Sequence, residues 1–480
     1  MIETLVFQKE NYNKIIMEGI MTGNIILQFI FFATMYPVLF IVYFLLRNAG
    51  RADKAYIYGA TLKKEYRTEE AVLKITEEYK KKLKKATIFL GIMPVVSFFI
   101  PYMSINLSFW IIWILVVCFF PMYYGAKANT QLRELKRKRG WYENYDTSYV
   151  DLKVISIPTK VNLRTFLIPI LGSIIPVFIA FANFQGYGYR VYPWIVATFG
   201  ACTLLFYVTA IWTDRQKIMV ISTNSDVNVN YARAKKNVWK WFWMVCSWIN
   251  TIFTWFILGI LFVRNSFTLA LIIGSFVYGL VVMGITVVLV KKINLIEKNY
   301  EDKKNIIDAA EDDQNWIFGM VYYNKKDKHY MTQTRFGMGT TVNLAHPAGL
   351  LTELIGLLAI LSMPIMCVWM IMLEFTPLEI KVENETIVCE QLSVKYEIPL
   401  ADIVEYKVVT ELPKLIKVNG NGMENQLSGT FEVYREGMFR VFLNPKNEIF
   451  LYITTEDKRY YLGGTDDAMT KEVIEFLEMR

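Results

Sequence analysis

Residues 267–290 read FTLALIIGSFVYGLVVMGITVVLV, without an Asp, Glu, Lys or Arg, and Lys291-Lys292 follows at once. About 20 apolar residues are enough to carry an α-helix across the hydrocarbon core of a bilayer. On an insertion scale each Leu, Ile or Phe contributes about 0.3–0.6 kcal/mol in favour, whereas a central Asp, Lys or Arg costs about 2.5–3.5 kcal/mol. This stretch therefore predicts a membrane-spanning helix.

Seven further apolar blocks predict an α-helical polytopic membrane protein with about eight transmembrane helices. The eight blocks are 24–46, 87–104, 105–124, 163–183, 192–212, 241–263, 267–290 and 350–373. The chain is 20% charged, whereas soluble domains are about 25% charged. The second block is the shortest and contains Pro94 and Pro101, so the sequence leaves open whether it spans fully.

Basic residues are concentrated in alternate connections, which predicts the orientation of the spans. The long connections 47–86, 125–162, 213–239 and 291–348 hold 34 Lys and Arg residues, whereas the short turns hold Arg190 and Arg264. Positively charged short loops stay in the cytoplasm. We therefore expect the long connections inside, and the N-terminal segment 1–23 and the C-terminal end outside. That N-terminal segment lacks the compact basic region of a cleavable signal peptide.

The composition changes at about residue 374. From there on 12 Lys and Arg residues stand against 20 Asp and Glu, a net charge of −8, whereas the first 373 residues hold 40 against 24, a net charge of +16. Predicted short strands are 380–382, 387–389, 394–398, 406–409, 431–433, 439–443 and 449–453, with turns at Asn419-Gly420, Asn421-Gly422 and Glu436-Gly437 and a helix over 471–479. This pattern predicts a small β-barrel or sandwich closed by one helix. We expect it to fold alone from about Pro377.

The resulting domain order is as follows. Segment 1–23 precedes a membrane region over 24–290 with seven spans, then come a cytoplasmic loop over 291–348, the eighth span over 349–373 and the C-terminal domain over 374–480.

A cytoplasmic helix is predicted within the first basic connection, over 63–85. Val72, Ile75, Tyr79 and Leu83 form an apolar stripe at helical spacing. The basic run Lys80–Lys85 then meets the membrane. This run indicates either a site that binds anionic lipid or an ordinary topology signal on a solvated helix.

One string before the last span is unlike a simple linker. Its singled-out residues are Trp316, Gly319, Tyr322, Asn324, Asp327, Arg335, Gly337, Gly339 and Asn343. They form either a recognition or gating element, or a packed motif that seats the loop against the membrane.

Two prolines stand within one predicted span. Pro169 and Pro176 lie seven residues apart, and each removes a helix hydrogen bond. They indicate either a substrate site at a broken helix or a kink satisfied by neighbouring helices.

Common catalytic and metal-binding patterns are missing from the sequence. The chain has 2 His and 5 Cys, without CxxC spacing. Paired carboxylates, a nucleophile–base pair and a phosphate loop are not visible, so we expect no metal, cofactor or catalytic residue. The positive charge lies in membrane-flanking loops, which does not suggest nucleic-acid binding.

Two parts of the chain resemble known families. The string from Trp316 through Tyr322, Asn324 and Asp327 to Asn343 resembles a short domain of unknown function in polytopic membrane proteins of Gram-positive bacteria. The region around Ile398–Ile403, with its closing helix, resembles bacterial pleckstrin-homology-like domains. The resemblance implies a bacterial plasma-membrane protein with this architecture and no known reaction.

Function is predicted in outline. We expect a binding, signalling or immunity-like envelope-protection protein, whose partners are the bilayer and another membrane or envelope protein or a peptide. A transporter or permease subunit is the chief alternative, but ion-coupled transporters place ionisable residues at membrane depth, and the centres of these spans have none. A membrane-embedded enzyme is a third interpretation. The ligand and the oligomeric state are not encoded in any visible motif.

Overall fold

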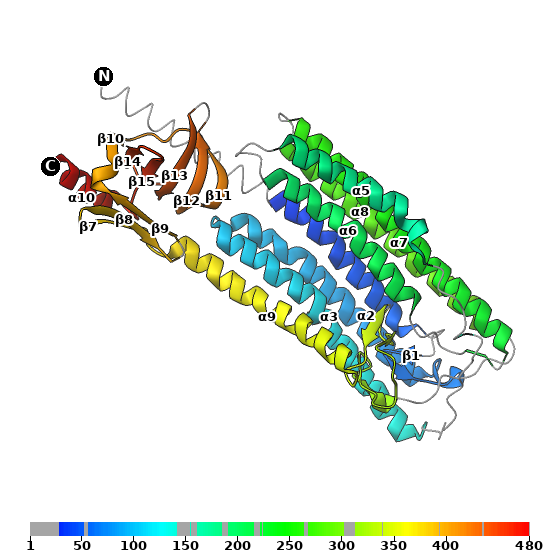
Figure 1. Cartoon of the computed structure of the whole chain (residues 1–480). Helices are drawn as coiled ribbons and strands as arrows, with labels where there is room; N and C mark the ends of the chain where they lie inside the picture. Colours follow the sequence, from blue (N-terminus) through cyan, green and yellow to red (C-terminus); the bar gives the residue numbers. More distant parts are fainter. Residues whose placement is uncertain are drawn as a thin grey trace.

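A computed structural model shows a long bundle of helices with a β-rich domain at one end (Figure 1). The structure describes residues 28–51, 56–141, 154, 161–184, 191–215, 221–222, 224–263, 267–301, 313–337, 339–392, 394–433 and 436–479. The turn between the fourth and fifth predicted spans and the first 27 residues lie outside the described residues.

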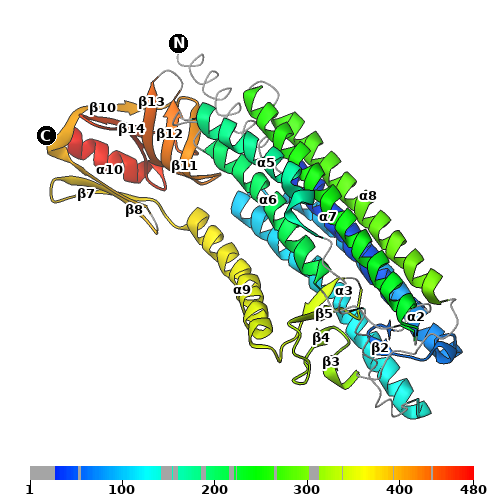
Figure 2. The ribbon, with the colours of Figure 1, turned by 45° about the vertical axis from the view of Figure 1, so that its right-hand side comes forward.

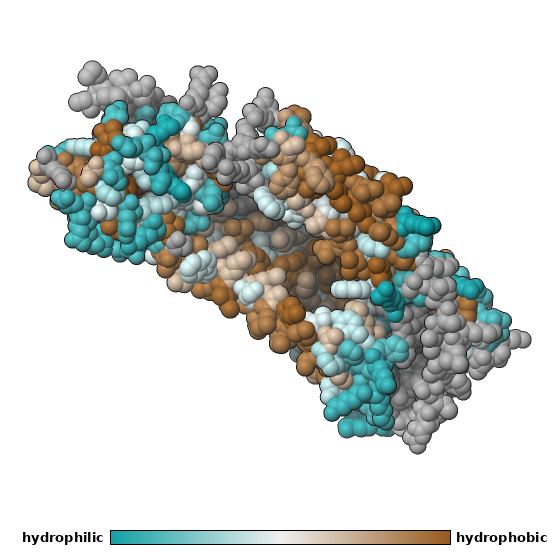
Figure 3. Space-filling model, viewed as in Figure 1, coloured by the Kyte–Doolittle hydropathy of each residue, from teal (hydrophilic) through white to brown (hydrophobic). Residues whose placement is uncertain are grey.

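Within the described part of the chain, seven helices are long and apolar enough to cross a membrane. They are the N-terminal span Gln28–Gly50, α3 (Met103–Arg139), α5 (Leu163–Asn183), α6 (Val191–Asp214), α7 (Ser225–Phe262), α8 (Phe267–Glu301) and α9 (Pro347–Phe375). Apolar side chains cover the middle of these helices, and polar ones cover both ends of the molecule (Figure 3). The chain is therefore a membrane-spanning protein.

The second apolar block is built differently from the others. Helix α2 runs from Glu70 to Ile92 and continues as a 3₁₀ helix, η3 (Met93–Phe99). The Ser97 hydroxyl donates to Gln28 Oε1 at 2.7 Å, and Trp110 Nε1 donates to the same oxygen at 2.9 Å. The end of η3 therefore lies level with the start of the N-terminal span. Together α2 and η3 run beside the membrane-spanning helices, but they are not among the seven that are long and apolar enough to cross, because α2 begins among charged residues.

The separate helix predicted over 63–85 is wrong in its bounds. The α-helix begins at Glu70 and merges with the second apolar block, because nothing between Lys85 and Thr87 stops it. The apolar stripe is confirmed, since Val72, Tyr79 and Leu83 are all buried.

Polar side chains of α7 join it to its neighbours. Asn250 Nδ2 donates to the Phe199 carbonyl of α6 at 2.7 Å, and Thr251 Oγ1 donates to the Pro169 carbonyl of α5 at 2.9 Å. A carbonyl at Gly172 is left free in α5, because Pro176 has no N–H to donate to it. Trp255 Nε1 donates to that carbonyl at 2.8 Å. The break at Pro176 is thus satisfied by a neighbouring helix.

We predict that Trp255→Phe destabilises the protein by about 0.6–1.7 kcal/mol, the range for hydrogen bonds between membrane helices. The loss of stability caused by Trp255→Phe should be smaller in a Pro176→Ala background. There the alanine N–H can donate to the Gly172 carbonyl in place of Trp255. SDS-induced unfolding of the four proteins of this cycle measures both values. An equal cost in both backgrounds would show that Trp255 acts through packing alone.

The basic end of the bundle carries short strand pairs between the helices. They are β1 (Tyr56–Ile57) with β2 (Ala60–Thr61), β3 (Trp316–Ile317) with β4 (Val321–Tyr322), and β5 (Met331–Gln333) with β6 (Thr340–Val342), all antiparallel. Short 3₁₀ turns accompany them at Asn48–Gly50, Lys64–Tyr66 and Asp313–Asn315. Figure 2 shows α9 leaving this end beside β5 and reaching the β-rich domain at the other end.

The C-terminal domain is a sandwich of two sheets closed by a helix. A three-stranded sheet contains β7 (Glu379–Glu383), β8 (Thr386–Gln391) and β9 (Val394–Pro399). A six-stranded sheet has the order β10-β14-β15-β13-β12-β11, with β10 (Ile403–Val409), β11 (Leu415–Met423), β12 (Gln426–Val433), β13 (Gly437–Leu443), β14 (Phe450–Thr455) and β15 (Arg459–Leu462). Helix α10 (Asp467–Glu478) packs on the core between the sheets through Val473, Ile474 and Leu477.

Two predicted turns in this domain are wrong. Asn419-Gly420 and Asn421-Gly422 lie inside strand β11, and the hairpin turns instead at Glu424 and Asn425. The strand tolerates its glycines because Gly420 pairs with Gly429 across the sheet, both at positive φ. A Cβ on Gly420 would lie 2.1 Å from the Ser428 carbonyl oxygen, so a side chain cannot fit there.

Candidate functional site

The string before the last span folds into a compact unit, which we call the loop unit (residues 56–69 and 313–346). It packs between the basic halves of α2 and α3. Phe336 and Tyr58 lie in its core with Tyr79 of α2 and Leu132 of α3. A Cβ on Gly125 of α3 would lie 2.1 Å from the ring of Phe336, so that glycine makes room for the unit.

Asn343 is the hydrogen-bonding centre of the loop unit. Its side chain is fully buried. Its Oδ1 accepts from the backbone N–H of Asn324 at 3.0 Å and of Ala345 at 3.1 Å. Its Nδ2 donates to the backbone carbonyls of Asn324 and Asp327, both at 2.9 Å. One amide thus satisfies both of its donors and holds together three parts of the string.

Aromatic rings surround the buried guanidinium of Arg335. The guanidinium carbon lies 4.2 Å from the ring centroid of Tyr56 and 4.9 Å from that of Trp316. The Trp316 ring in turn packs on Tyr322 with centroids 4.8 Å apart. Such cation–π contacts are stronger when desolvated, as here.

Asp313 connects this cation to the membrane bundle, and the sequence analysis did not single it out. Its Oδ1 accepts from Arg335 Nη1 at 2.9 Å and from Thr61 Oγ1 at 2.7 Å. Its Oδ2 accepts from Lys136 Nζ of α3 at 3.0 Å. Lys136 is 2% exposed, Asp313 5% and Arg335 7%. A buried carboxylate between two cations therefore ties β2, α3 and the string together.

Tyr322, Asn324 and Asp327 form a second polar chain. The Tyr322 hydroxyl donates to Asp327 Oδ2 at 3.0 Å and accepts from Asn324 Nδ2 at 3.1 Å. Burial raises the pKa of Tyr322 to about 12, so the phenol stays protonated and can donate. Asp327 Oδ1 faces His329 Nδ1 at 2.6 Å on the exposed turn.

The predicted glycines have distinct roles. Gly319 (φ 71°) packs on Gly59 (φ 77°) so closely that a Cβ on Gly59 would lie 2.5 Å from the Gly319 Cα. Gly337 and Gly339 also have positive φ, at 77° and 122°, but a Cβ there would meet little or nothing. The last two therefore serve the backbone conformation rather than a close approach.

The side chains of the predicted string thus mostly face one another. Trp316, Tyr322, Arg335 and Asn343 are buried. The surface that the string offers to a partner comes from the intervening turn, which exposes Tyr323, Lys325, Lys326, Lys328 and His329. In the described part of the chain, no group of three or more His, Cys, Asp or Glu residues is placed to hold a metal ion.

A second polar junction lies at the opposite end of α9, and we call it the outer joint. Glu374 of α9 accepts from the backbone N–H of Ser104 at 2.9 Å, and Glu424 of the β11–β12 turn accepts from that of Met103 at 2.8 Å. Both carboxyl groups therefore cap the N-terminus of α3, where the helix dipole favours negative charge. The Gln391 amide of β8 donates to the carbonyls of Leu373 and Thr376 at 2.9 Å.

Comparison with known proteins identifies both regions. Residues 325–350 match a family of unknown function (DUF5808), and residues 378–480 match the bacterial PH domain. No curated protein and no solved structure matches the chain. The protein is thus a polytopic membrane protein that carries a DUF5808 segment before its last span and a bacterial PH domain after it.

Proposed function

We propose that this protein is a transmembrane coupling device of a bacterial plasma membrane, in which the PH domain binds a ligand outside and α9 transmits that state to the loop unit inside. The observation that carries the proposal is α9 itself. It has 29 residues, or about 43 Å at 1.5 Å per residue, and each of its ends is fastened to one of the two family-matched regions.

The inner end of α9 is attached to the centre of the loop unit. His346 caps the helix through Nδ1, which accepts from the Ala348 N–H at 3.2 Å. A Cβ on Gly349 would lie 2.1 Å from the Asn343 carbonyl oxygen, so the first turn sits directly on the hydrogen-bonding centre. A shift of α9 must therefore displace Asn343 or break this contact.

The outer end is attached just as directly to the PH domain. Gln391 donates to the carbonyl of Leu373 in the last turn of α9 and to that of Thr376 directly after the helix, and its amide pairs with that of Gln426. Along its length α9 packs on α3, while Leu351, Leu358 and Ile365 remain more than half exposed. Pro364 breaks the hydrogen-bond pattern in the middle of the helix and offers a point of bending.

The charge of the PH domain indicates the kind of ligand. Residues 378–480 hold 12 Lys and Arg against 19 Asp and Glu, a net charge of −7, which repels anionic headgroups, so a peptide or protein surface is the better ligand. The core of this domain lies within residues 378–477, which supports independent folding.

We predict that the isolated fragment 377–480 does not sediment with anionic vesicles at low or physiological salt. Salt-sensitive sedimentation with anionic vesicles alone would contradict this.

The coupling itself is tested by hydrogen exchange on the full-length protein in lipid nanodiscs. Glu424→Ala and Gln391→Ala loosen the outer joint, and we expect faster amide exchange in 316–346, at the other end of α9. Because coupling free energies are reciprocal, Asn343→Ala should speed exchange in 386–391. Glu472→Ala, an exposed change on α10, is the matched control. Effects confined to the end that carries each substitution would contradict the proposal.

A further inference from the structure

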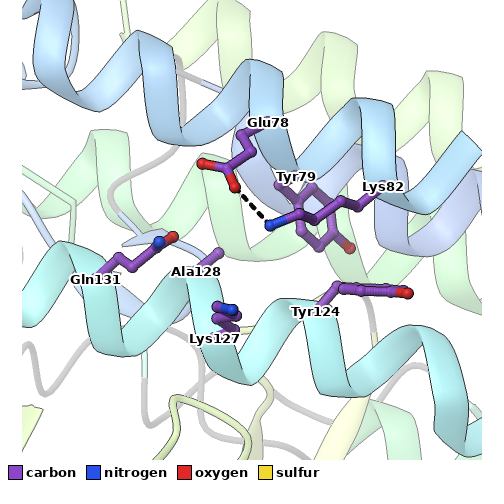
Figure 4. Close-up of a pocket in the computed structure, with 7 residues that line it drawn as sticks. All are labelled: Glu78, Tyr79, Lys82, Tyr124, Lys127, Ala128 and Gln131. Carbon is purple, nitrogen blue, oxygen red and sulfur yellow. Dashed lines mark hydrogen bonds and ion pairs between the residues drawn. The ribbon is translucent and has the colours of Figure 1, made fainter.

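A groove between α2 and α3 lies at the basic end of the bundle (Figure 4). It is a shallow groove that is partly open to solvent, with enclosed room for about one water molecule. Glu78 and Lys82 line it from α2, and Tyr124, Lys127 and Gln131 line it from α3. The close-up shows the polar ends of Lys82, Lys127 and Gln131 around the space between the two helices.

The depth of the groove follows from the side chains on either side of it. On α2 the run of closely spaced exposed apolar side chains begins at Ile88 and Phe89, and on α3 it ends at Tyr123. At 1.5 Å per residue, Lys82 lies about 9 Å beyond Ile88 and Lys127 about 6 Å beyond Tyr123. The polar headgroup layer is about 5–8 Å thick on each side of a bilayer. Lys82 Nζ turns back toward Glu78, away from this apolar surface. The two ammonium groups therefore lie near the solvent edge of the headgroup layer.

The net positive charge of the groove favours the binding of an anion. Two lysines face one glutamate, and Glu78 holds Lys82 through an ion pair at 2.5 Å. An ammonium has three donors, so this pair fixes the direction of Lys82 and leaves it protons to donate. Gln131 adds an uncharged amide, and Tyr124 adds a hydroxyl at the membrane side.

We propose that this groove binds the phosphate group of an anionic glycerophospholipid. Lys82 and Lys127 donate to the phosphate oxygens, and the acyl chains lie against the exposed side chains of Ile88 and Phe89. The exposed apolar side chains farther along α2 favour a lipid over a free anion as the ligand. The site is separate from the PH domain and the loop unit, and it holds whether or not α9 couples the two.

The test is native mass spectrometry of the full-length protein with phosphatidylglycerol or phosphatidylcholine. The double variant Lys82→Gln/Lys127→Gln should lose affinity for phosphatidylglycerol by about tenfold, or about 1.4 kcal/mol. The control Lys80→Gln/Lys84→Gln removes the same charge from exposed positions of α2 outside the groove, and it should lose about twofold or less. Phosphatidylcholine binding should not change in either variant.

Two results would overturn the proposal. Equal losses in both double variants would mean that diffuse attraction by the lysine run, and not the groove, holds the lipid. Displacement of phosphatidylglycerol by millimolar inorganic phosphate would assign the groove to a free anion. Restoration of binding by Lys82→Arg/Lys127→Arg would support it, because arginine keeps both the charge and the reach.

Discussion

Replacing Asp313 with alanine should destabilise the loop unit by about 3–5 kcal/mol, the usual cost of removing one partner from a buried ion pair. Lys136 and Arg335 would lose the carboxylate that lies within 3.0 Å of both, in a place where water cannot replace it. The free energy of opening is measured by hydrogen exchange of the amides in 316–344. Asp457→Ala, an exposed change in the PH domain, is the control.

A double-mutant cycle shows whether the charge itself is responsible. Asp313→Ala combined with Arg335→Met should cost less than the sum of the two single variants, because the second change removes one of the cations left behind. Strict additivity, or a cost below about 1 kcal/mol for Asp313→Ala alone, would contradict the role given to this carboxylate.

Asn343→Ala should cost about 2–4 kcal/mol, since it leaves two backbone N–H groups and two carbonyls without their partner in a fully buried place. Asn324→Ala removes side-chain bonds to Tyr322 and Lys326 from a half-buried place and should cost about 1 kcal/mol. Hydrogen exchange of the amides in 316–344 gives both values, because these amides belong to the unit itself. A larger loss of stability for Asn324→Ala than for Asn343→Ala would mean that Asn343 is not the hydrogen-bonding centre of the loop unit.

The sequence predicted those features that depend on local composition. Apolar length located the seven helices and most strands of the PH domain, because burial in lipid or between two sheets leaves a pattern in consecutive residues. The turn predicted at Glu436-Gly437 is confirmed at Glu436, and Gly437 begins strand β13. Strand β11 was missed because its Asn-Gly pairs are typical of turns, and only the facing Gly429 on β12 makes them fit a strand.

The candidate site was predicted only where its residues stand close together in the sequence. Asn343, Trp316 and Arg335 stand within one short string, so they could be singled out together. Asp313 could not, because its partner Lys136 lies 177 residues away, and in the sequence it is one of three consecutive acidic residues with nothing to set it apart from Glu311 and Asp312. The outer joint was likewise hidden, since Met103 and Glu424 are 321 residues apart. Contacts of this range arise from the fold and leave no local signal.

The central claim is that the loop unit and the PH domain lie on opposite sides of the membrane, joined by α9. Site-directed thiol labelling tests it most directly, in a background where the five native cysteines are replaced. Cysteines at Asp457 and at Lys325 occupy exposed positions in the PH domain and in the loop unit, respectively. On intact cells, an impermeant reagent should label the cysteine at 457 and not the one at 325, and both should react after permeabilisation. Labelling of both on intact cells, or of 325 alone, would contradict this account.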